Sequence, residues 1–173
     1  MELAKTRRTF ERLMEFVVIV LMVALAVVVT LGVVYRKFGT SLVWYDEIAS
    51  ILLAWITYYG AALAALKRAH IGFPGLVDGL PRGPRVAVTL VAEACVIGFF
   101  VLLAWVGYSV LEVLATDSLV SLPEISVKYT QSVIPIGAAL FVIAELLMLP
   151  DVLREALESD GSAARSGRSE VNP

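Results

Sequence analysis

Long apolar stretches alternate with short polar ones along this chain. A helix that crosses the roughly 30 Å hydrocarbon layer of a membrane needs about 20 apolar residues, because each residue advances it by about 1.5 Å. Four stretches meet this requirement, over residues 14–35, 48–66, 86–111 and 129–149. The pattern therefore predicts an all-α integral membrane protein with four transmembrane helices.

The first stretch also has features of a secretory signal peptide. Four basic residues precede it: Lys5, Arg7, Arg8 and Arg12. The triplet that begins at Ala24 formally fits a cleavage site. The apolar run nevertheless continues through Val34, well past that triplet. This favours a helix that is retained in the membrane as the first span.

The distribution of Lys and Arg predicts the orientation. Eleven of these residues lie before the first span, between the second and third, or after the fourth, whereas three lie in the other two loops. Cytoplasmic loops carry the excess of basic residues. We therefore expect both ends in the cytoplasm (N-in, C-in). Residues 1–150 would form the four-span membrane domain, and 151–173 a cytoplasmic tail, largely disordered from residue 159.

The loop between the first two spans ends in Trp44, Tyr45, Asp46 and Glu47. Trp and Tyr favour the membrane interface because each ring is apolar and carries one polar atom. Acidic residues favour a helix N-terminus, which carries partial positive charge. We expect a short segment from Ser41 that lies along the outer surface. It would turn into the second span at Asp46 and Glu47, with Glu47 capping the helix.

Composition excludes several classes of function. The 173 residues are 59% hydrophobic, with one cysteine, one histidine and a net charge of −2, and the mean hydropathy is +0.84. A single His excludes a bis-histidine haem and a multi-histidine metal site, and a single Cys excludes a disulfide or thiolate metal site within the chain. The negative charge argues against nucleic-acid binding. The sequence contains no phosphate-binding loop of Walker type. We predict no enzyme activity, no cofactor and no metal.

Two carboxylates lie inside predicted spans, where an ionisable group is a functional candidate by default. Glu93 lies about two turns into the third span and Glu145 about one turn before the end of the fourth. Both are expected at the cytoplasmic edge, level with Lys67, Arg68 and His70. We favour charge pairing among Lys67, Arg68, Glu93 and Glu145. A proton or ion pathway and contact with a partner are alternatives. His70 is expected to contact the backbone, a lipid headgroup or a partner.

Small residues recur at helical spacing in the second span: Ser50, Ala54, Thr57, Gly60, Ala61, Ala64 and Ala65. Ala94 and Gly98 repeat this spacing in the third span, and Gly137 lies in the fourth. Such spacing lets helix backbones approach closely. It fits packing within a four-helix bundle and packing against a partner helix equally well. The centres of the spans are otherwise apolar, and Pro135 is the one residue there that could interrupt a helix. A secondary transporter usually needs broken helices around a polar site at the membrane midplane, so this pattern is typical of an accessory subunit.

Several short motifs follow one another along the chain: Trp44 and Glu47, Gly60, Arg68, His70-Ile71, Ser121-Leu122-Pro123 and Ile134-Pro135-Ile136-Gly137. Together they resemble one family, the DctQ-type small permease of tripartite ATP-independent periplasmic (TRAP) transporters. The likeness covers about residues 10–150. The order and spacing of the motifs agree with the four-span topology predicted from hydropathy.

The resemblance implies a role and a set of partners. A subunit of this type sits in the bacterial inner membrane and binds a large multi-span permease that holds the substrate and sodium sites. A periplasmic binding protein delivers the substrate, typically an organic acid, and an ion gradient drives uptake. The small subunit, surrounded by membrane lipids, would be part of the static scaffold. The implied partner or scaffold contacts are Trp44, Asp46, Glu47, Gly60, Arg68, His70, Pro135 and Gly137.

Two other functions remain open. The first is a small homo-oligomeric channel or exporter, which would need a polar face along one span, and Thr30, Thr57 and Ser132 do not form such a face. The second is a structural membrane protein that assists assembly and has no part in transport. A large permease or a periplasmic binding protein encoded next to this chain would favour the TRAP assignment over both.

Overall fold

The structure is a computed structural model that describes residues 2–67 and 81–158. Its helices are α1 (Glu2–Lys37), α2 (Tyr45–Leu66), α4 (Arg82–Val113), the 3-10 helix η1 (Leu114–Thr116), α5 (Val127–Gln131) and α6 (Val133–Glu158). Four segments are long and apolar enough to cross a membrane: Lys5–Lys37, Tyr45–Leu66, Gly83–Thr116 and Val127–Arg154. The all-α, four-span prediction is therefore confirmed. The N-in, C-in orientation stays a prediction, and the tail from residue 159 lies outside the described residues.

The helices extend beyond the apolar stretches that predict them. The 36 residues of α1 correspond to about 54 Å at about 1.5 Å per residue, whereas the hydrocarbon layer is about 30 Å thick. The charged residues before the first apolar stretch therefore belong to the same helix as the span itself. They continue α1 out of the hydrocarbon, into the headgroup layer and water.

A seven-residue loop, residues 38–44, joins α1 to α2. Its second residue is Gly39, whose φ of 81° lies in the left-handed region that glycine adopts without steric cost. The amide of Thr40 donates to the carbonyl of Tyr35 at 3.1 Å and closes the end of α1. The predicted segment from Ser41 is thus non-helical up to Trp44. Its position on the outer surface of the membrane stays a prediction.

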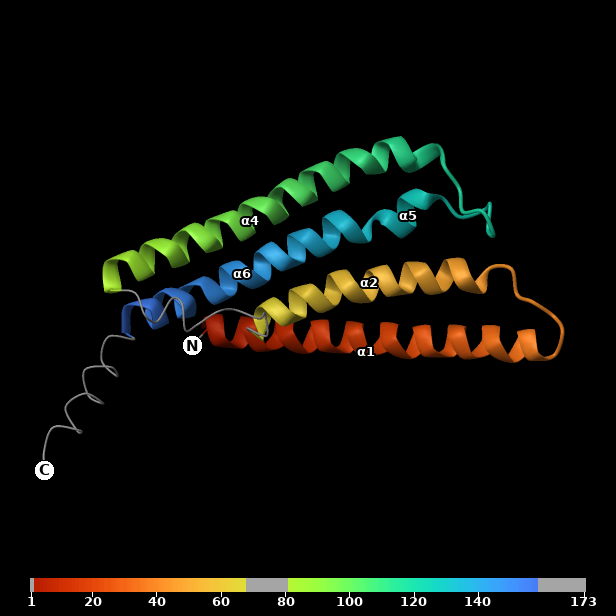
Figure 1. The fold of residues 1–173 in the computed structure, drawn as a ribbon, viewed down its shortest axis with the longest axis horizontal. Helices are drawn as coiled ribbons and strands as arrows, with labels where there is room; N and C mark the ends of the chain where they lie inside the picture. Colours follow the sequence, from red (N-terminus) through yellow and green to blue (C-terminus); the bar gives the residue numbers. More distant parts are fainter. Residues whose placement is uncertain (1, 68–80, 159–173) are drawn as a thin grey trace, which may run out of the picture.

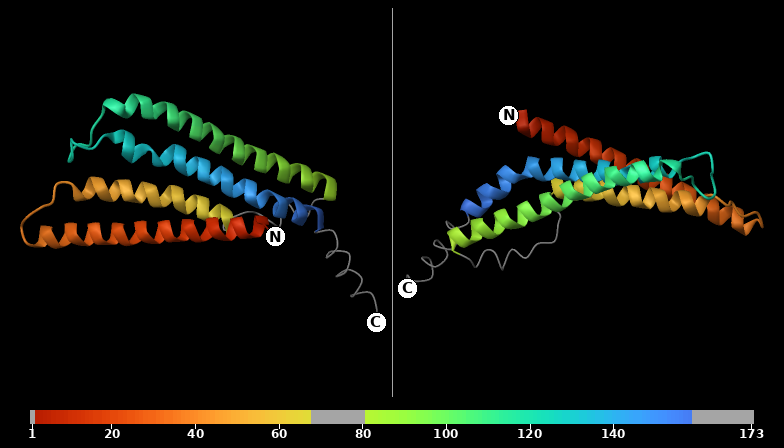
Figure 2. Two further views of the ribbon diagram at one scale, coloured as in Figure 1. Left: turned by 180° about the vertical axis from the view of Figure 1, so that it is seen from behind. Right: turned by 90° about the horizontal axis from the view of Figure 1, so that it is seen from above.

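The four long helices form one curved layer in the order α1, α2, α6, α4 (Figure 1). Extensive contacts join α1 to α2, α2 to α6 and α6 to α4. The edge helices α1 and α4 are separated by the other two, so the arrangement differs from a closed four-helix bundle. Seen from above, the layer is thin and α1 crosses its neighbours obliquely (Figure 2).

The layer has two distinct ends. The loop end carries residues 38–44 and 117–126, whereas the terminal end carries the start of α1 at Glu2 and the end of α6 at Glu158 (Figure 1). The two central helices, α2 and α6, both start at the loop end and so run parallel. Each packs against an antiparallel edge helix.

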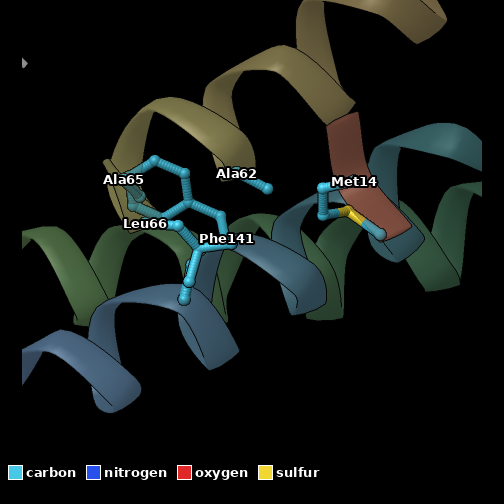
Figure 3. Packing of buried hydrophobic residues seen from close by; sticks show 6 residues of the cluster. Met14, Ala62, Ala65, Leu66 and Phe141 are labelled. Carbon is cyan, nitrogen blue, oxygen red and sulfur yellow. The ribbon is translucent and has the colours of Figure 1, made fainter. Parts of the chain in front are cut away.

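The main cluster of buried side chains lies where α1, α2 and α6 meet, towards the terminal end. Met14, Ala62, Ala65, Leu66 and Phe141 converge there from the three helices (Figure 3). The ring of Phe141 stacks on Phe100 of α4 with centroids 3.7 Å apart and planes at 11°. One aromatic pair therefore ties the α4 edge to the cluster.

Most apolar side chains outside this cluster are exposed. In α4 none of the most hydrophobic 18-residue window is buried, and even in the last span the buried share is 39%. Large side chains such as Phe99 and Trp105 are 59% and 75% exposed. A layer one helix thick cannot hide them, so lipid or a partner protein must cover both faces.

The fourth span is interrupted at Ser132, between α5 and α6. Pro135 explains the break, because it has no amide hydrogen for the carbonyl four residues earlier, that of Gln131. The indole nitrogen of Trp55 on α2 donates to the carbonyl of Thr130 at 2.9 Å. A side chain of the neighbouring helix thus supplies a donor to the backbone beside the interruption, as polar groups inside a membrane require.

Candidate functional site

Glu47 joins the start of α2 to a loop far along the chain. Its carboxylate accepts two backbone hydrogen bonds, from the amide of Val120 at 3.0 Å and from that of Ser121 at 2.8 Å. The hydroxyl of Ser121 lies 3.3 Å from the carbonyl of Val43 and donates to it. We call these four residues the loop-end clasp. It holds the loop between α4 and α5 against the α1–α2 loop.

The clasp differs from the helix cap expected of Glu47. The N-cap of α2 is Trp44, and no side chain donates to or accepts from the helix start there. The Glu47 carboxylate instead points at two amides 73 and 74 residues away in sequence. Trp44 is half-buried and Asp46 is exposed. Of the three residues predicted to form the turn into α2, Glu47 is the one whose side chain forms hydrogen bonds to the other loop.

The loop from residue 117 to 126 is ordered by its own backbone. Ser118 and Ser126 form an antiparallel bridge, and the amide of Val127 donates to the carbonyl of Asp117 at 2.9 Å. The Ser126 hydroxyl accepts from the amide of Lys128 at 3.3 Å and so caps α5. Leu119 is 6% exposed and anchors the loop on the layer. Glu47 therefore binds a loop that is already ordered by its own hydrogen bonds.

Pro135 and Gly137 lie inside the subunit, between its central helices and α4. A Cβ added at Gly137 would lie 2.6 Å from the Cβ of Tyr58 on α2. One added at Gly107 of α4 would lie 3.3 Å from the nitrogen and the Cδ of Pro135. The two residues therefore permit close approach of α2, α6 and α4 to one another. Contact with a partner was predicted for both and stays untested.

Gly60 has the opposite surroundings. A Cβ built at this position meets no atom within 4 Å. Gly60 shares one side of α2 with Ser50, Leu53 and Thr57, at intervals of three and four residues, and these three are exposed. We call these four residues the open face of α2. Ala65, at the far end of the predicted small-residue stripe, is instead buried in the core at 3% exposure, so the stripe divides between internal packing and a free surface.

Charged side chains fasten the terminal end of the layer. Arg7 of α1 forms an ion pair with Asp151 of α6 at 3.0 Å and donates to the carbonyl of Leu66, the last residue of α2, at 3.4 Å. Lys67 follows α2 directly and binds Glu15, with Glu11 at 4.0 Å. We call Arg7, Glu11, Glu15, Lys67 and Asp151 the terminal-end clasp. It joins three of the four long helices.

The protonation of Lys67 follows from this clasp. The hydrogen bond to Glu15 raises the pKa of Lys67 above its usual value of 10.5, and attraction to Glu15 and Glu11 adds to the effect, against a smaller cost of burial. A raised folded-state pKa contributes stability that is fully present below the usual value and lost as pH rises through the folded one. The clasp is therefore intact at neutral pH.

Pairing among Lys67, Arg68, Glu93 and Glu145 was predicted at this end. Lys67 pairs with Glu11 and Glu15 of α1, which sequence reasoning did not consider. Within residues 2–67 and 81–158, no ion pair shorter than 4.0 Å joins Glu93 to a basic side chain. Glu93 is half-buried, and Glu145 is 9% exposed on α6. Arg68 and His70 lie outside the described residues, so pairing with Glu93 or Glu145 stays a prediction.

The described part of the chain offers surfaces for contact. No group of three or more His, Cys, Asp or Glu residues that could hold a metal ion occurs in the part of the chain that the structure describes. A groove of about 350 Å³ on α4 is lined by Ala87, Val88, Val91 and Ala92, all apolar. The fold thus defines a multi-pass membrane protein with two broad apolar faces, a loop-end clasp and a terminal-end clasp.

Comparison with known proteins gives the family. Residues 25–155 match the family model described as tripartite ATP-independent periplasmic transporters, DctQ component. The chain is also 26% identical over 166 residues to the sialic acid TRAP transporter small permease protein SiaQ of Vibrio cholerae serotype O1, and the match covers 95% of each chain. The chain belongs to the DctQ family of TRAP transporter small permeases, as the sequence motifs predicted.

Proposed function

We propose that this small permease is a scaffold for a large permease subunit in the bacterial inner membrane. The complex takes up an organic acid that a periplasmic binding protein delivers, and an ion gradient drives the uptake. The relative in Vibrio cholerae is named for sialic acid, which carries a carboxylate. That name supports an organic acid as the substrate class of the present transporter.

The observation that carries this proposal is the single layer of helices. A layer one helix thick exposes two apolar faces (Figure 2), and a large membrane partner can cover one of them while lipid covers the other. A self-contained carrier instead needs broken helices around a polar site at the membrane midplane. The interruption at Ser132 lies near the loop end of α6, away from the middle of the layer.

The open face of α2 supports a specific site of contact. Gly60 is half-buried, and no atom lies within 4 Å of its Cβ position. Helix association in lipid depends on close fit because lipid tails are as apolar as the helices. A glycine facing empty space in the isolated subunit gives a partner helix room to approach. We infer that the large permease packs against this face.

The test is Gly60→Leu, measured by co-purification with the large permease in detergent and by substrate uptake in cells. We expect the variant subunit to be produced and to melt like the wild type, yet to lose both the complex and the uptake. The matched control is Gly98→Leu, at a glycine of α4 that also has no atom within 4 Å of its Cβ position. Gly98 lies on the side of α4 away from α6, so its complex should form normally.

Other results would overturn the assignment. Normal complex and uptake with Gly60→Leu would remove the open face of α2 from the interface. Loss of the complex with Gly98→Leu alone would place the large permease at the α4 edge. A subunit that purifies and cross-links only with its own copies, and never with the large permease, would support the homo-oligomeric alternative and contradict the scaffold role.

A further inference from the structure

One stripe of side chains runs along α1 on the side that faces away from the layer. Its members are spaced by three or four residues and so lie above one another on the helix. Three are basic and three are apolar, in this order: Lys5, Arg8, Arg12, Phe16, Ile19 and Val23. All six are exposed, and the apolar three by 66%, 59% and 58%. The stripe changes sharply from charged to apolar between Arg12 and Phe16.

Several other side chains of α1 at this end contact the rest of the chain. Met14, on the opposite side of the helix, is 3% exposed in the core. Arg7 pairs with Asp151, and Glu11 and Glu15 face Lys67. In the described parts of the chain, by contrast, Lys5, Arg8 and Arg12 have no acidic partner within 4.0 Å. Three positive charges thus have no acidic counterpart among the described residues.

The dimensions of the stripe match those of a phospholipid. Lys5 and Arg12 are about 10 Å apart along the helix, and Arg12 and Val23 are about 16 Å apart, at about 1.5 Å per residue. One leaflet contributes about 15 Å, half of the roughly 30 Å hydrocarbon layer. The basic part therefore lies at headgroup depth when the apolar part runs through one leaflet.

We propose that this stripe binds one anionic phospholipid in the leaflet at the terminal end. Arg8 and Arg12 offer guanidinium groups that match the geometry of a phosphate, and Lys5 adds a point charge. An acyl chain lies along Phe16, Ile19 and Val23. A net negative headgroup such as phosphatidylglycerol is preferred over a neutral one such as phosphatidylcholine, whose own cation would meet the three basic side chains.

Acidic residues of α1 lie beside the stripe. Glu11 and Glu15 lie on the neighbouring side of α1 and would weaken anion binding if they were free. Lys67 pairs with Glu15 and lies 4.0 Å from Glu11. The terminal-end clasp carries two positive and three negative charges, so with the three basic residues of the stripe this part of the molecule has a net charge of +2. The site needs no contact with another subunit and is independent of the proposed scaffold role.

The experiment uses the purified full chain in a neutral detergent with added dioleoyl phosphatidylglycerol, or dioleoyl phosphatidylcholine as the neutral lipid. Native mass spectrometry counts the lipids retained, and Trp fluorescence follows melting. We expect one phosphatidylglycerol to be retained in preference to phosphatidylcholine and to raise the melting temperature. Replacing Lys5, Arg8 and Arg12 by Gln should weaken retention by roughly fivefold per charge removed, on the order of a hundredfold in total.

The matched control removes the same formal charge at the other end of the layer, with Arg36, Lys37 and Lys128 replaced by Gln. Unchanged retention of phosphatidylglycerol in this control would support binding at the stripe. Equal loss of retention in both triple variants would mean that net charge alone attracts the lipid, and would overturn the proposal. Equal retention of both lipids would overturn it too, as would equal stabilisation by glycerol phosphate, which has no acyl chains. If the first triple variant does not fold, Arg12→Gln against Arg36→Gln makes the same comparison.

Discussion

The contact between the two central helices can be tested at one atom. Gly137 of α6 packs on Tyr58 of α2 so closely that an added Cβ would lie 2.6 Å from the Cβ of Tyr58 and 3.1 Å from its Cδ1. A Cβ is fixed to the backbone, so no change of rotamer relieves the first overlap. Gly137→Ala must therefore push α2 and α6 apart where they cross.

The size of the effect follows from that distance. Ordinary contacts of a Cβ begin at 3.4 Å, so the helices must separate locally by about 1 Å. A gap of about 0.5–1 Å removes a quarter to a half of the attractive energy of each dispersion contact across it. Overpacking of this kind lowers the free energy of unfolding by about 1–3 kcal/mol. At about 2–4 °C per kcal/mol for a chain of this length, the overlap should lower the melting temperature by roughly 2–12 °C relative to a Gly-to-Ala change without overlap.

The control is Gly60→Ala, two residues from Tyr58 on the same helix, where the new Cβ meets nothing within 4 Å. In both variants alanine stabilises the helix by about 1 kcal/mol relative to glycine. The difference between the two melting temperatures therefore reports the effect of the overlap alone. Melting is followed by Trp fluorescence of the purified subunit in detergent. If Gly137→Ala melts at the same temperature as Gly60→Ala, the close packing of α2 on α6 is refuted.

Two further changes test the polar contacts of the loop end. Glu47→Ala removes the carboxylate that accepts from the amides of Val120 and Ser121, so hydrogen exchange at these amides should quicken while the core remains protected. Assembly of the complex should fall together with uptake. Unchanged exchange at the two amides would contradict the clasp. Trp55→Phe keeps a ring but loses the indole hydrogen bond to the carbonyl of Thr130, and should lower the free energy of unfolding by about 1 kcal/mol, whereas wild-type stability would show that this bond contributes little.

The spans themselves could be predicted from the sequence, whereas their ends could not. Hydropathy identifies where a helix lies in hydrocarbon, but a helix continues into water wherever its polar residues favour helix. In α1 this adds the turns that carry Arg7 and Glu11, directly before Glu15 at the start of the predicted span. Extending the first span back to these residues would have placed both carboxylates level with Lys67, so a signal for the terminal-end clasp was present in the sequence and was missed.

The order of helices within the layer left no such signal. Side chains that face lipid and side chains that face another helix are both apolar in a membrane protein, so hydropathy does not separate them. Phe99 and Phe100 are neighbours in α4, yet Phe99 is 59% exposed while Phe100 stacks on Phe141. The role of Glu47 was hidden for a related reason, because its partners lie 73 and 74 residues away in sequence.

The position of the polar contacts explains how a thin layer can hold its shape in lipid. Helices in hydrocarbon gain little from burying apolar surface against one another, and an edge helix such as α1 has only one extensive neighbour. Close packing at Gly137 aligns the central helices, but it cannot fix the ends. Glu47 fixes the loop end, and Arg7 with Lys67 fixes the terminal end. The hydrophobic middle of the layer is then left free for lipid and for a partner.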